Sequence, residues 1–318
     1  MKVIIIGSGE MLMNIIAGCE DINCNIVGVL RAEQNYLSPI KQFFKNTINP
    51  SKDFTYVKSH KIPIIKCCSV NTEKFKKNVL KLNPDIIIVA SWGEKIKKNI
   101  IDLPKLCTIN VHPSLLPKYR GPNPYIETIR NFEKESGVTF HLMNENFDTG
   151  EILLQKKVSI YEEDTGKELK TRITSAARDG IKELLANLDN DIIIPISQNE
   201  ELASYYGRIK AEDTILNFEK TAKEVVAQIR ALHPFSKAYF SHNTHFLIPN
   251  PYKLSIEENI KNYSPKQVYE VQPKTRTIAI VCADNKVIKM QDVKLFGLLN
   301  LLSDLYIKLR IKEGNFIN

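Results

Sequence analysis

Three polar residues lie where predicted strands end, and together they could carry out acyl transfer. Asn110 and His112 stand two residues apart at the end of an apolar run, so on an extended strand their side chains project from one face. Asp148 lies in a predicted turn further along, and Ser114 and Thr149 lie nearby in the sequence. An amide can donate to a developing oxyanion, while an imidazole and a carboxylate can move protons.

The backbone that follows His112 is restricted. Pro113 comes directly after it, Pro117 five residues later, and Arg120 and Gly121 form the exit. A buried histidine with a carboxylate partner is often only a satisfied core residue, but this much restriction at a polar strand end favours a pre-organised site. The other histidines are weaker candidates, one in an alternating strand and four in loop-like sequence: His141, and His60, His233, His242 and His245.

No serine or cysteine lies in a nucleophile motif, since the pattern G-x-S-x-G is absent from the sequence. We therefore expect transfer directly to an external amine or hydroxyl, without a covalent acyl-enzyme.

The elements that must position these residues alternate between strands and helices over the first 190 residues. β-Branched or alternating runs predict strands at 2–6, 26–30, 61–65, 86–90, 137–143 and 152–158. Apolar periodicity predicts helices at 10–17, 71–81, 124–132 and 167–188. This order indicates an α/β fold with a mostly parallel, helix-flanked sheet.

The chain changes character after about residue 200. A helix is expected at 221–232, and from residue 238 only short alternating runs remain, such as 277–282 and 287–293. These runs predict a small β-barrel or sandwich. We place an N-terminal catalytic domain at 1–208 and a C-terminal domain with its linker helix at 209–318.

Composition bounds the class of protein. The 318 residues carry a net charge of +8, which favours anionic partners or reflects lysines spread over solvated faces. Six cysteines form no C-x-x-C pair, so neither a zinc site nor a disulfide framework is readable. The apolar start is too short for a signal peptide and no run approaches a membrane span. We expect a cytoplasmic protein with no metal and no membrane partner.

Three further features are open to two interpretations. Gly7-Ser8-Gly9 follows a strand, but Leu12 occupies the third glycine position of a dinucleotide motif, so a plain turn is favoured over a nicotinamide site. Residues 31–61 mix lysines with aromatic residues and could form a lid, an RNA-contacting loop or an ordinary loop. Trp92 follows the strand at 86–90, where open α/β sheets bind ligands, or is a packing residue.

These motifs resemble a known family. Asn110-Val111-His112, the segment 114–117 (Ser-Leu-Leu-Pro), Arg120-Gly121 and the segment 148–150 (Asp-Thr-Gly) are similar to the signature of the formyltransferases that use 10-formyltetrahydrofolate. Segments 204–210, 215–218 and 229–234 resemble the linker of the longer members, and the tail resembles their small open β-barrel.

The resemblance implies a Rossmann-like formyltransferase domain followed by an OB-like barrel. It carries over Asn110, His112 and Asp148 as the catalytic triad, acting on 10-formyltetrahydrofolate without a metal and releasing tetrahydrofolate. It also implies a folate site made of two strand-end turns and a loop: Ser91, Trp92, Gly93, Ser114, Leu115, Leu116, Pro117, Glu145 and Phe147.

The acceptor amine is less clear, because the sequence departs from the methionyl-tRNA members of that family. Pro113 replaces their usual glycine, residues 120–124 read Arg-Gly-Pro-Asn-Pro in place of Arg-Gly-Ala-Ala-Pro, and their basic tRNA-clamping insertion is not recognisable in 31–61. We expect an amino group on a nucleotide-linked sugar as acceptor, with initiator methionyl-tRNA as the alternative. A non-catalytic RNA-binding protein is a remote third hypothesis.

Overall fold

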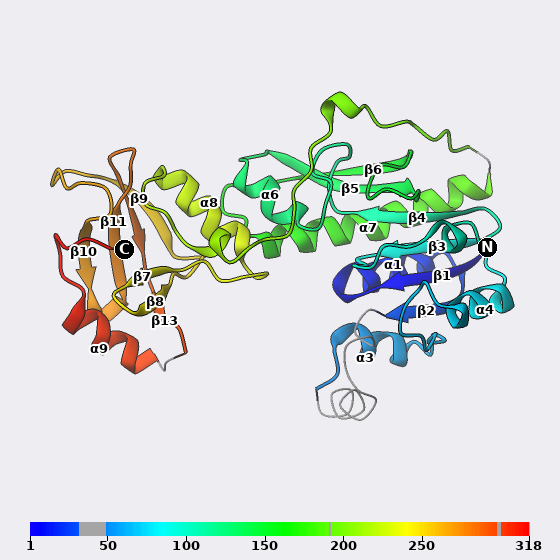
Figure 1. Cartoon of the computed structure of the whole chain (residues 1–318), viewed down its shortest axis with the longest axis horizontal. Helices are drawn as coiled ribbons and strands as arrows, with labels where there is room; N and C mark the ends of the chain where they lie inside the picture. Colours follow the sequence, from blue (N-terminus) through cyan, green and yellow to red (C-terminus); the bar gives the residue numbers. More distant parts are fainter. Residues whose placement is uncertain (32–48, 191, 298–299, 318) are drawn as a thin grey trace. The chain divides into compact units, whose positions relative to one another are not determined.

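The chain folds into two compact units, which the computed structural model describes apart from residues 32–48, 191, 298–299 and 318 (Figure 1). The first unit comprises residues 1–124, 135–159 and 170–207, and the second comprises 125–134, 160–169 and 208–318. Two segments that precede the expected boundary at 208/209 therefore group with the C-terminal part.

A six-stranded sheet forms the centre of the first unit. Its strand order is β2-β1-β3-β4-β5-β6. The first four of these strands are parallel, and β5 and β6 join as antiparallel neighbours. The strands are β1 (Lys2–Gly7), β2 (Asn25–Arg31), β3 (Ile86–Ala90), β4 (Cys107–His112), β5 (Glu135–Leu142) and β6 (Ile152–Ser159). The expected α/β class with a mostly parallel sheet is thus confirmed.

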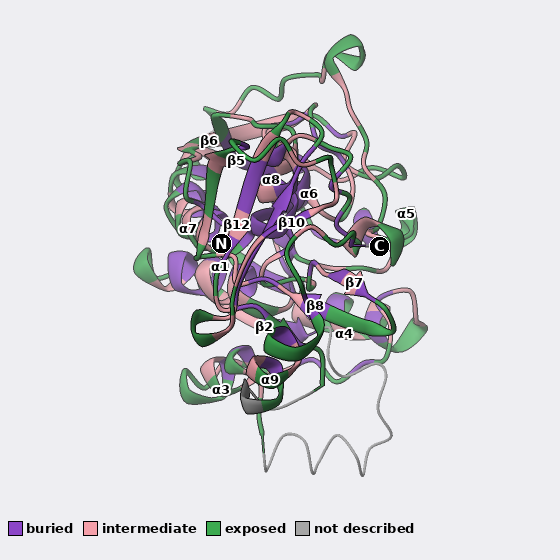
Figure 2. Cartoon of the chain, turned by 90° about the vertical axis from the view of Figure 1, so that its left-hand side faces the viewer, coloured by how far each residue is buried: buried purple, intermediate pink, exposed green. Residues whose placement is uncertain are grey.

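Helices cover this sheet because its parallel strands are apolar along their whole length. All five residues of β3 are buried, a pattern that requires a layer on each face. Figure 2 shows buried residues gathered on the strands and the inner sides of helices. The helices named from the first part of the chain are α1 (Gly9–Asp21), α3 (Lys52–Ser59), α4 (Glu73–Leu82), α5 (Lys98–Ile101), α6 (Pro124–Arg130) and α7 (Gly166–Asp189).

The expected strand at 61–65 is wrong, because only an isolated bridge between Val29 and Ile64 forms there. The segment before it, expected to be irregular, contains α3. That helix is tied to the sheet by a buried ion pair in which Arg31 Nη2 lies 2.9 Å from Asp53 Oδ1. Burial opposes ionisation of Asp53, but the hydrogen bonds from Arg31 and Ser51 outweigh it and lower the pKa of that carboxyl. Lysines 41 and 45 and Phe43 and Phe44 lie outside the described residues.

The second unit is built on two antiparallel sheets. The first has the order β10-β11-β12-β9 and the second β13-β8-β7, as expected for a small barrel-like domain. The strands are β7 (Phe240–His242), β8 (His245–Ile248), β9 (Leu254–Glu258), β10 (Val268–Gln272), β11 (Thr277–Val281), β12 (Lys286–Met290) and β13 (Lys294–Leu295). Its helices include α8 (Ala222–Leu232) and α9 (Asn300–Arg310), and residues 125–130 of α6 also fall in this unit. Helix α9 was not expected from the sequence.

The described residues contain neither a membrane-spanning helix nor a cluster of metal ligands. No described helix combines the length and the apolar character needed to cross a membrane. Within 1–31, 49–190, 192–297 and 300–317, no group of three or more His, Cys, Asp or Glu side chains is arranged to hold a metal ion.

Candidate active site

The site lies at the carboxyl end of the parallel strands, where β4 ends in Asn110 and His112. Parallel strands present their carboxyl ends at one edge of a sheet, which is the usual ligand-binding edge of such folds. In the sheet register, Asn110 lies beside Val89 of β3 on one side and His141 of β5 on the other. Strand pairing therefore decides which side chains meet Asn110.

Asp148 reaches Asn110 and His112 from the loop between β5 and β6. Its φ of 56° is in the left-handed region, which is uncommon for a non-glycine residue and often marks a functional position. Asp148 Oδ1 accepts a hydrogen bond from Asn110 Nδ2 at 3.3 Å and lies 3.4 Å from His112 Nδ1. Asp148 Oδ2 accepts from the backbone N–H of Gly121 at 2.9 Å. The structure thus brings the three expected catalytic residues together.

His112 is held from both sides and is only 4% exposed. Its Nε2 lies 2.9 Å from the carbonyl oxygen of Tyr119. Since a carbonyl can only accept, Nε2 carries a proton in this arrangement, and Nδ1 faces the Asp148 carboxylate. His112 therefore connects the turn that follows β4 to the carboxylate.

His141 is a fourth polar residue of the site that sequence reasoning set aside. Its Nδ1 lies 2.8 Å from the carbonyl of Leu142, so Nδ1 carries the proton and Nε2 is an acceptor. Asn110 Nδ2 lies 3.0 Å from that Nε2. Burial, and next the nearby His112, lower the pKa of His141 to about 4, which keeps the ring neutral at ordinary pH.

The amide of Asn110 is oriented by these contacts. Its nitrogen points to His141 Nε2 and to Asp148 Oδ1, and both of these groups accept. The oxygen and nitrogen of an amide are otherwise hard to assign, but two acceptors fix the nitrogen side. Asn110 can donate a hydrogen bond to an oxyanion in the cleft if its nitrogen gives up its bond to His141 or to Asp148.

A second set of residues holds the Asp148 loop in place. Gln198 Nε2 donates to the backbone carbonyls of Asp148 and Gly150 at 2.9 and 2.7 Å. Arg120 Nη2 in turn donates to Gln198 Oε1 at 2.8 Å and to Glu200 Oε1 at 2.7 Å. Arg120 came from the sequence as part of a motif, but no local pattern marked Gln198 or Glu200.

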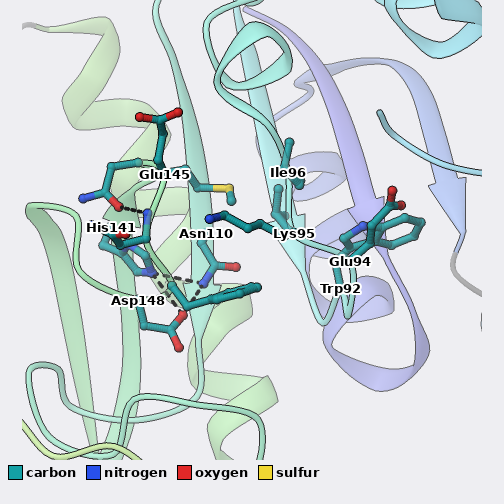
Figure 3. A pocket seen from close by; sticks show the side chains of 13 residues that line it. Trp92, Glu94, Lys95, Ile96, Asn110, His141, Glu145 and Asp148 are labelled. Carbon is teal, nitrogen blue, oxygen red and sulfur yellow. Dashed lines mark hydrogen bonds and ion pairs between the residues drawn. The ribbon is translucent and has the colours of Figure 1, made fainter. Parts of the chain in front are cut away.

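A cleft opens beside Asn110 and Asp148 (Figure 3). The expected folate-binding residues Trp92, Glu145 and Phe147 line it, together with Lys95 and Met143. Ser91 and Gly93 flank Trp92 in the same turn but do not line this cleft, and both are exposed. The additional lining residues are Val89, Glu94, Ile96, His141, Asn144 and Asn146.

The segment 114–117 lies outside the cleft lining and builds the turn after β4. Ser114 is fully buried, and its hydroxyl donates to the carbonyl of Lys118 at 2.7 Å. The backbone N–H of Leu116 donates to Thr139 Oγ1 at 3.1 Å, and the peptide bond to Pro117 is cis. Leu115 packs close to Gly137 of β5. In this structure the segment shapes the backbone that carries Tyr119 and Gly121.

One residue of the cleft wall, Trp92, has a donor left unpaired by the described side chains and backbone. The indole N–H of Trp92 is buried and has no hydrogen-bond partner within the described residues. A buried donor without a partner carries a desolvation cost, which a ligand acceptor would relieve. Trp92 also packs against the apolar cluster beneath the sheet edge, so its ring is supported.

Comparison with known proteins places this site in a family. Residues 1–185 match the family model described as formyl transferase, and residues 208–297 match that of the formyl transferase C-terminal domain. The chain belongs to the formyltransferase family. The resemblance seen in the sequence is thereby confirmed, and the protein is an enzyme of formyl transfer.

The proteins that this chain is similar to carry different names. Methionyl-tRNA formyltransferase of Ehrlichia ruminantium strain Welgevonden is 32% identical over 84% of this chain and 85% of its own. The enzyme of the same name from Thermotoga maritima is 32% identical over 73% of this chain and 72% of its own. Among solved structures, an N-formyltransferase from Helicobacter canadensis, in complex with folinic acid and dTDP-3-aminofucose, superposes with a TM-score of 0.68 at 23% identity, covering 92% of this chain and 99% of that one. The last likeness shows a shared fold.

Proposed function

We propose that this enzyme transfers the formyl group of 10-formyltetrahydrofolate to an acceptor amine, with Asn110, His112 and Asp148 as its catalytic groups. The observation that carries the proposal is the meeting of these three side chains at one strand edge, within contacts of 3.3 and 3.4 Å, in a chain of the formyltransferase family.

The roles follow from the contacts of each group. Asn110 lines the cleft, and its amide nitrogen donates to the formyl oxygen as negative charge builds up on that oxygen. Asp148 accepts the proton that the attacking amine loses, directly or through water, and His112, whose Nδ1 lies 3.4 Å from Oδ1, holds the carboxylate in place. The donor leaves as tetrahydrofolate, with its N10 taking the electron pair of the broken bond and the proton that Asp148 received from the amine.

His141 serves as a positioning residue in this scheme. Its neutral Nε2 accepts from Asn110 and thereby fixes the amide nitrogen between His141 and Asp148. Trp92, Glu145 and Phe147 hold the folate ring through the cleft wall. The contributions of Ser91 and Gly93, and of the segment 114–117, are proposed on the resemblance alone.

For the acceptor, we infer initiator methionyl-tRNA, because the relatives that match over most of the chain carry that name. The net charge of +8 suits a polyanionic partner. A nucleotide-linked amino sugar is the second candidate. It is favoured by Pro113 and by the Pro122-Asn123-Pro124 run, which depart from the methionyl-tRNA members in the turn beside the catalytic groups.

The experiment that decides between them offers both acceptors to the purified enzyme. Tetrahydrofolate release from 10-formyltetrahydrofolate is followed with charged initiator tRNA and, separately, with a panel of nucleotide-linked amino sugars. We expect turnover with the charged tRNA. Turnover with an amino sugar but not with the charged tRNA would show that the second candidate is the acceptor. Tight tRNA binding without any turnover would support a non-catalytic RNA-binding protein.

The triad is tested by changing one contact at a time. Asp148→Asn keeps the size of the side chain but removes its charge, so we expect kcat to fall by about three orders of magnitude, a loss of about 4 kcal/mol of transition-state stabilisation. Tetrahydrofolate binding, measured by titration calorimetry, should change little. A near-normal kcat in Asp148→Asn and Asn110→Ala would defeat the catalytic assignment.

A further inference from the structure

A second cavity, of about 350 Å³, lies wholly within the C-terminal unit. Its walls come from α8, from the end of α6 with the residues that follow it, from the segment after β6, and from Ile256 of β9. A cavity of this size falls in the range of small-molecule sites. None of its lining residues belongs to the catalytic site.

Helix α8 contributes a regular stripe to this cavity. Lys223, Val226, Ala227 and Arg230 are spaced at i, i+3, i+4 and i+7, so they lie on one face of the helix. The two small apolar residues form the middle of the stripe, and the two cations mark its ends. Lys223 is exposed, whereas Arg230 is only 7% exposed.

The guanidinium of Arg230 is incompletely satisfied. Its Nη1 donates to the carbonyl of Glu162 and its Nη2 to Glu163 Oε2 at 2.5 Å. Its Nε is buried with no partner in the part of the chain that the structure describes. The side chain of Glu163 is 82% exposed, whereas the guanidinium of Arg230 is buried. The anion that now pairs with Arg230 is therefore a surface carboxylate. A ligand anion could replace it at small cost.

Two aromatic side chains at the same cavity are exposed. Phe132 follows α6 with a φ of 57° and is 49% exposed, and Tyr161 is 62% exposed. The N–H of Phe132 bonds to the carbonyl of Ile129 and that of Glu133 to the carbonyl of Thr128, which is the pattern of a Schellman helix end. Glycine is the usual residue at such a left-handed position. Phe132 therefore adopts a backbone conformation that is unfavourable for a phenylalanine, while its ring is exposed.

The charged residues of either sign that line the cavity are equal in number, but its cations have donors to spare. Three carboxylates line the cavity, and one of them, Asp164, accepts the backbone N–H of Tyr161 at 2.8 Å; the others are Glu133 and Glu162. Lys134 and Lys223 also line it, and neither takes part in an ion pair among the described residues. The cations with donors to spare are therefore Lys134, Lys223 and Arg230.

We propose that this cavity binds a nucleoside phosphate, with the base against Phe132 and Tyr161 and the phosphate between Lys223 and Arg230. Aromatic side chains stack on any base, and arginine and lysine donate to phosphate oxygens. The inference does not depend on the identity of the formyl acceptor. It assigns this unit a small-molecule site separate from the catalytic cleft.

The test measures binding of ADP and UDP to the full chain by titration calorimetry, with tetrahydrofolate present to fill the catalytic cleft. We expect one nucleotide per chain that tetrahydrofolate does not displace. Lys223→Ser and Phe132→Gly should each weaken it at least tenfold, whereas Lys220→Ser, a lysine just before the same helix, should change it less than twofold. Glu163→Gln should tighten it severalfold, because it removes the competing carboxylate.

One control separates binding from folding. Phe132→Gly replaces a strained residue with the one that the helix end prefers, so its melting temperature should be equal to or above that of the parent chain. Binding that is absent, that tetrahydrofolate displaces, or that is unchanged in both Phe132→Gly and Lys223→Ser would overturn the proposal. The proposal would also be overturned if ADP and UDP did not bind while tRNA binding depended on Phe132 and Lys223. The cavity would then be part of an RNA-binding surface.

Discussion

At the residue scale, the chemistry of this enzyme depends on which side-chain atoms of the site donate hydrogen bonds and which accept them. Asp148 receives three polar neighbours, namely Asn110, His112 and the backbone of Gly121. His141 adds an acceptor that is neutral because burial disfavours its charged form. If His141 were protonated, it would present a donor to the Asn110 nitrogen, and the two groups would no longer bond.

Titration of His141 should couple folding to pH. Its pKa is about 4 in the folded chain, against about 6.5 for an unperturbed histidine. Between these values the unfolded chain binds more protons, so the free energy of unfolding falls as the pH drops from about 6.5 to about 4, by about 3 kcal/mol from this group. The variant His141→Gln cannot titrate at this position but keeps a hydrogen-bond acceptor. Its free energy of unfolding, measured with urea, should therefore depend less steeply on pH. Equal slopes in the two proteins would contradict the burial of a neutral ring.

At the scale of elements, the site is a strand edge completed by loops. Strands β4 and β5 bring Asn110 beside His141, while the segment after α7 ties down the loop that carries Asp148. That segment is itself joined to the sheet, because Ile196 pairs with Ile152 at the start of β6. The position of the carboxylate therefore depends on residues some fifty positions further along the chain.

Gln198 offers a direct test of this dependence. Gln198→Leu removes both bonds to the carbonyls of Asp148 and Gly150, so we expect kcat to fall about 100-fold through misplacement of the carboxylate. The matched control is Gln228→Leu, since Gln228 Nε2 also bonds two backbone carbonyls, those of Asp213 and Ile215, but in the C-terminal unit. Both variants should lose stability, and only the first should lose kcat. Parallel losses of kcat would show a general effect of stability.

At the scale of the whole molecule, the two units are interleaved in sequence. The segments 125–134 and 160–169 belong to the C-terminal unit although they interrupt the N-terminal one. Within that unit, Tyr125 stacks on Phe235 at 5.6 Å between ring centroids, and Tyr252 Oη donates to Glu168 at 3.1 Å. A linear cut at the expected domain boundary would therefore separate partners.

A chain ending at residue 207 should consequently be unstable. It would keep both inserted segments but lose the residues they pack on, which exposes apolar surface such as the ring of Tyr125. We expect it to aggregate on expression or to melt well below the full chain, as followed by circular dichroism. Co-expression with residues 208–318 should restore solubility. A cooperative melt of the 1–207 chain at the temperature of the full protein would refute this interleaving.

Local patterns in the sequence determined much of this protein. Unbroken β-branched runs predict β1 and β3 because strands buried on both faces are apolar throughout, and the two-residue period of a strand places Asn110 and His112 on one face. Asp148 was the third candidate from its residue type and its predicted turn, and the resemblance joined it to Asn110 and His112. The expectations failed for the strand at 61–65, where only an isolated bridge forms, and for α9, which was missed although it is as long as α8.

Only the tertiary structure decided the neighbours of these groups. His141 looked like one residue of an alternating strand, and it became a partner of Asn110 because the antiparallel register sets residue 141 against residue 110. Gln198, Arg230 and the strained Phe132 likewise carry no local signal, since their roles depend on what the folded chain brings beside them. Spacing along a strand determines which face a side chain takes, but register and burial determine what it meets there and which protonation state it keeps.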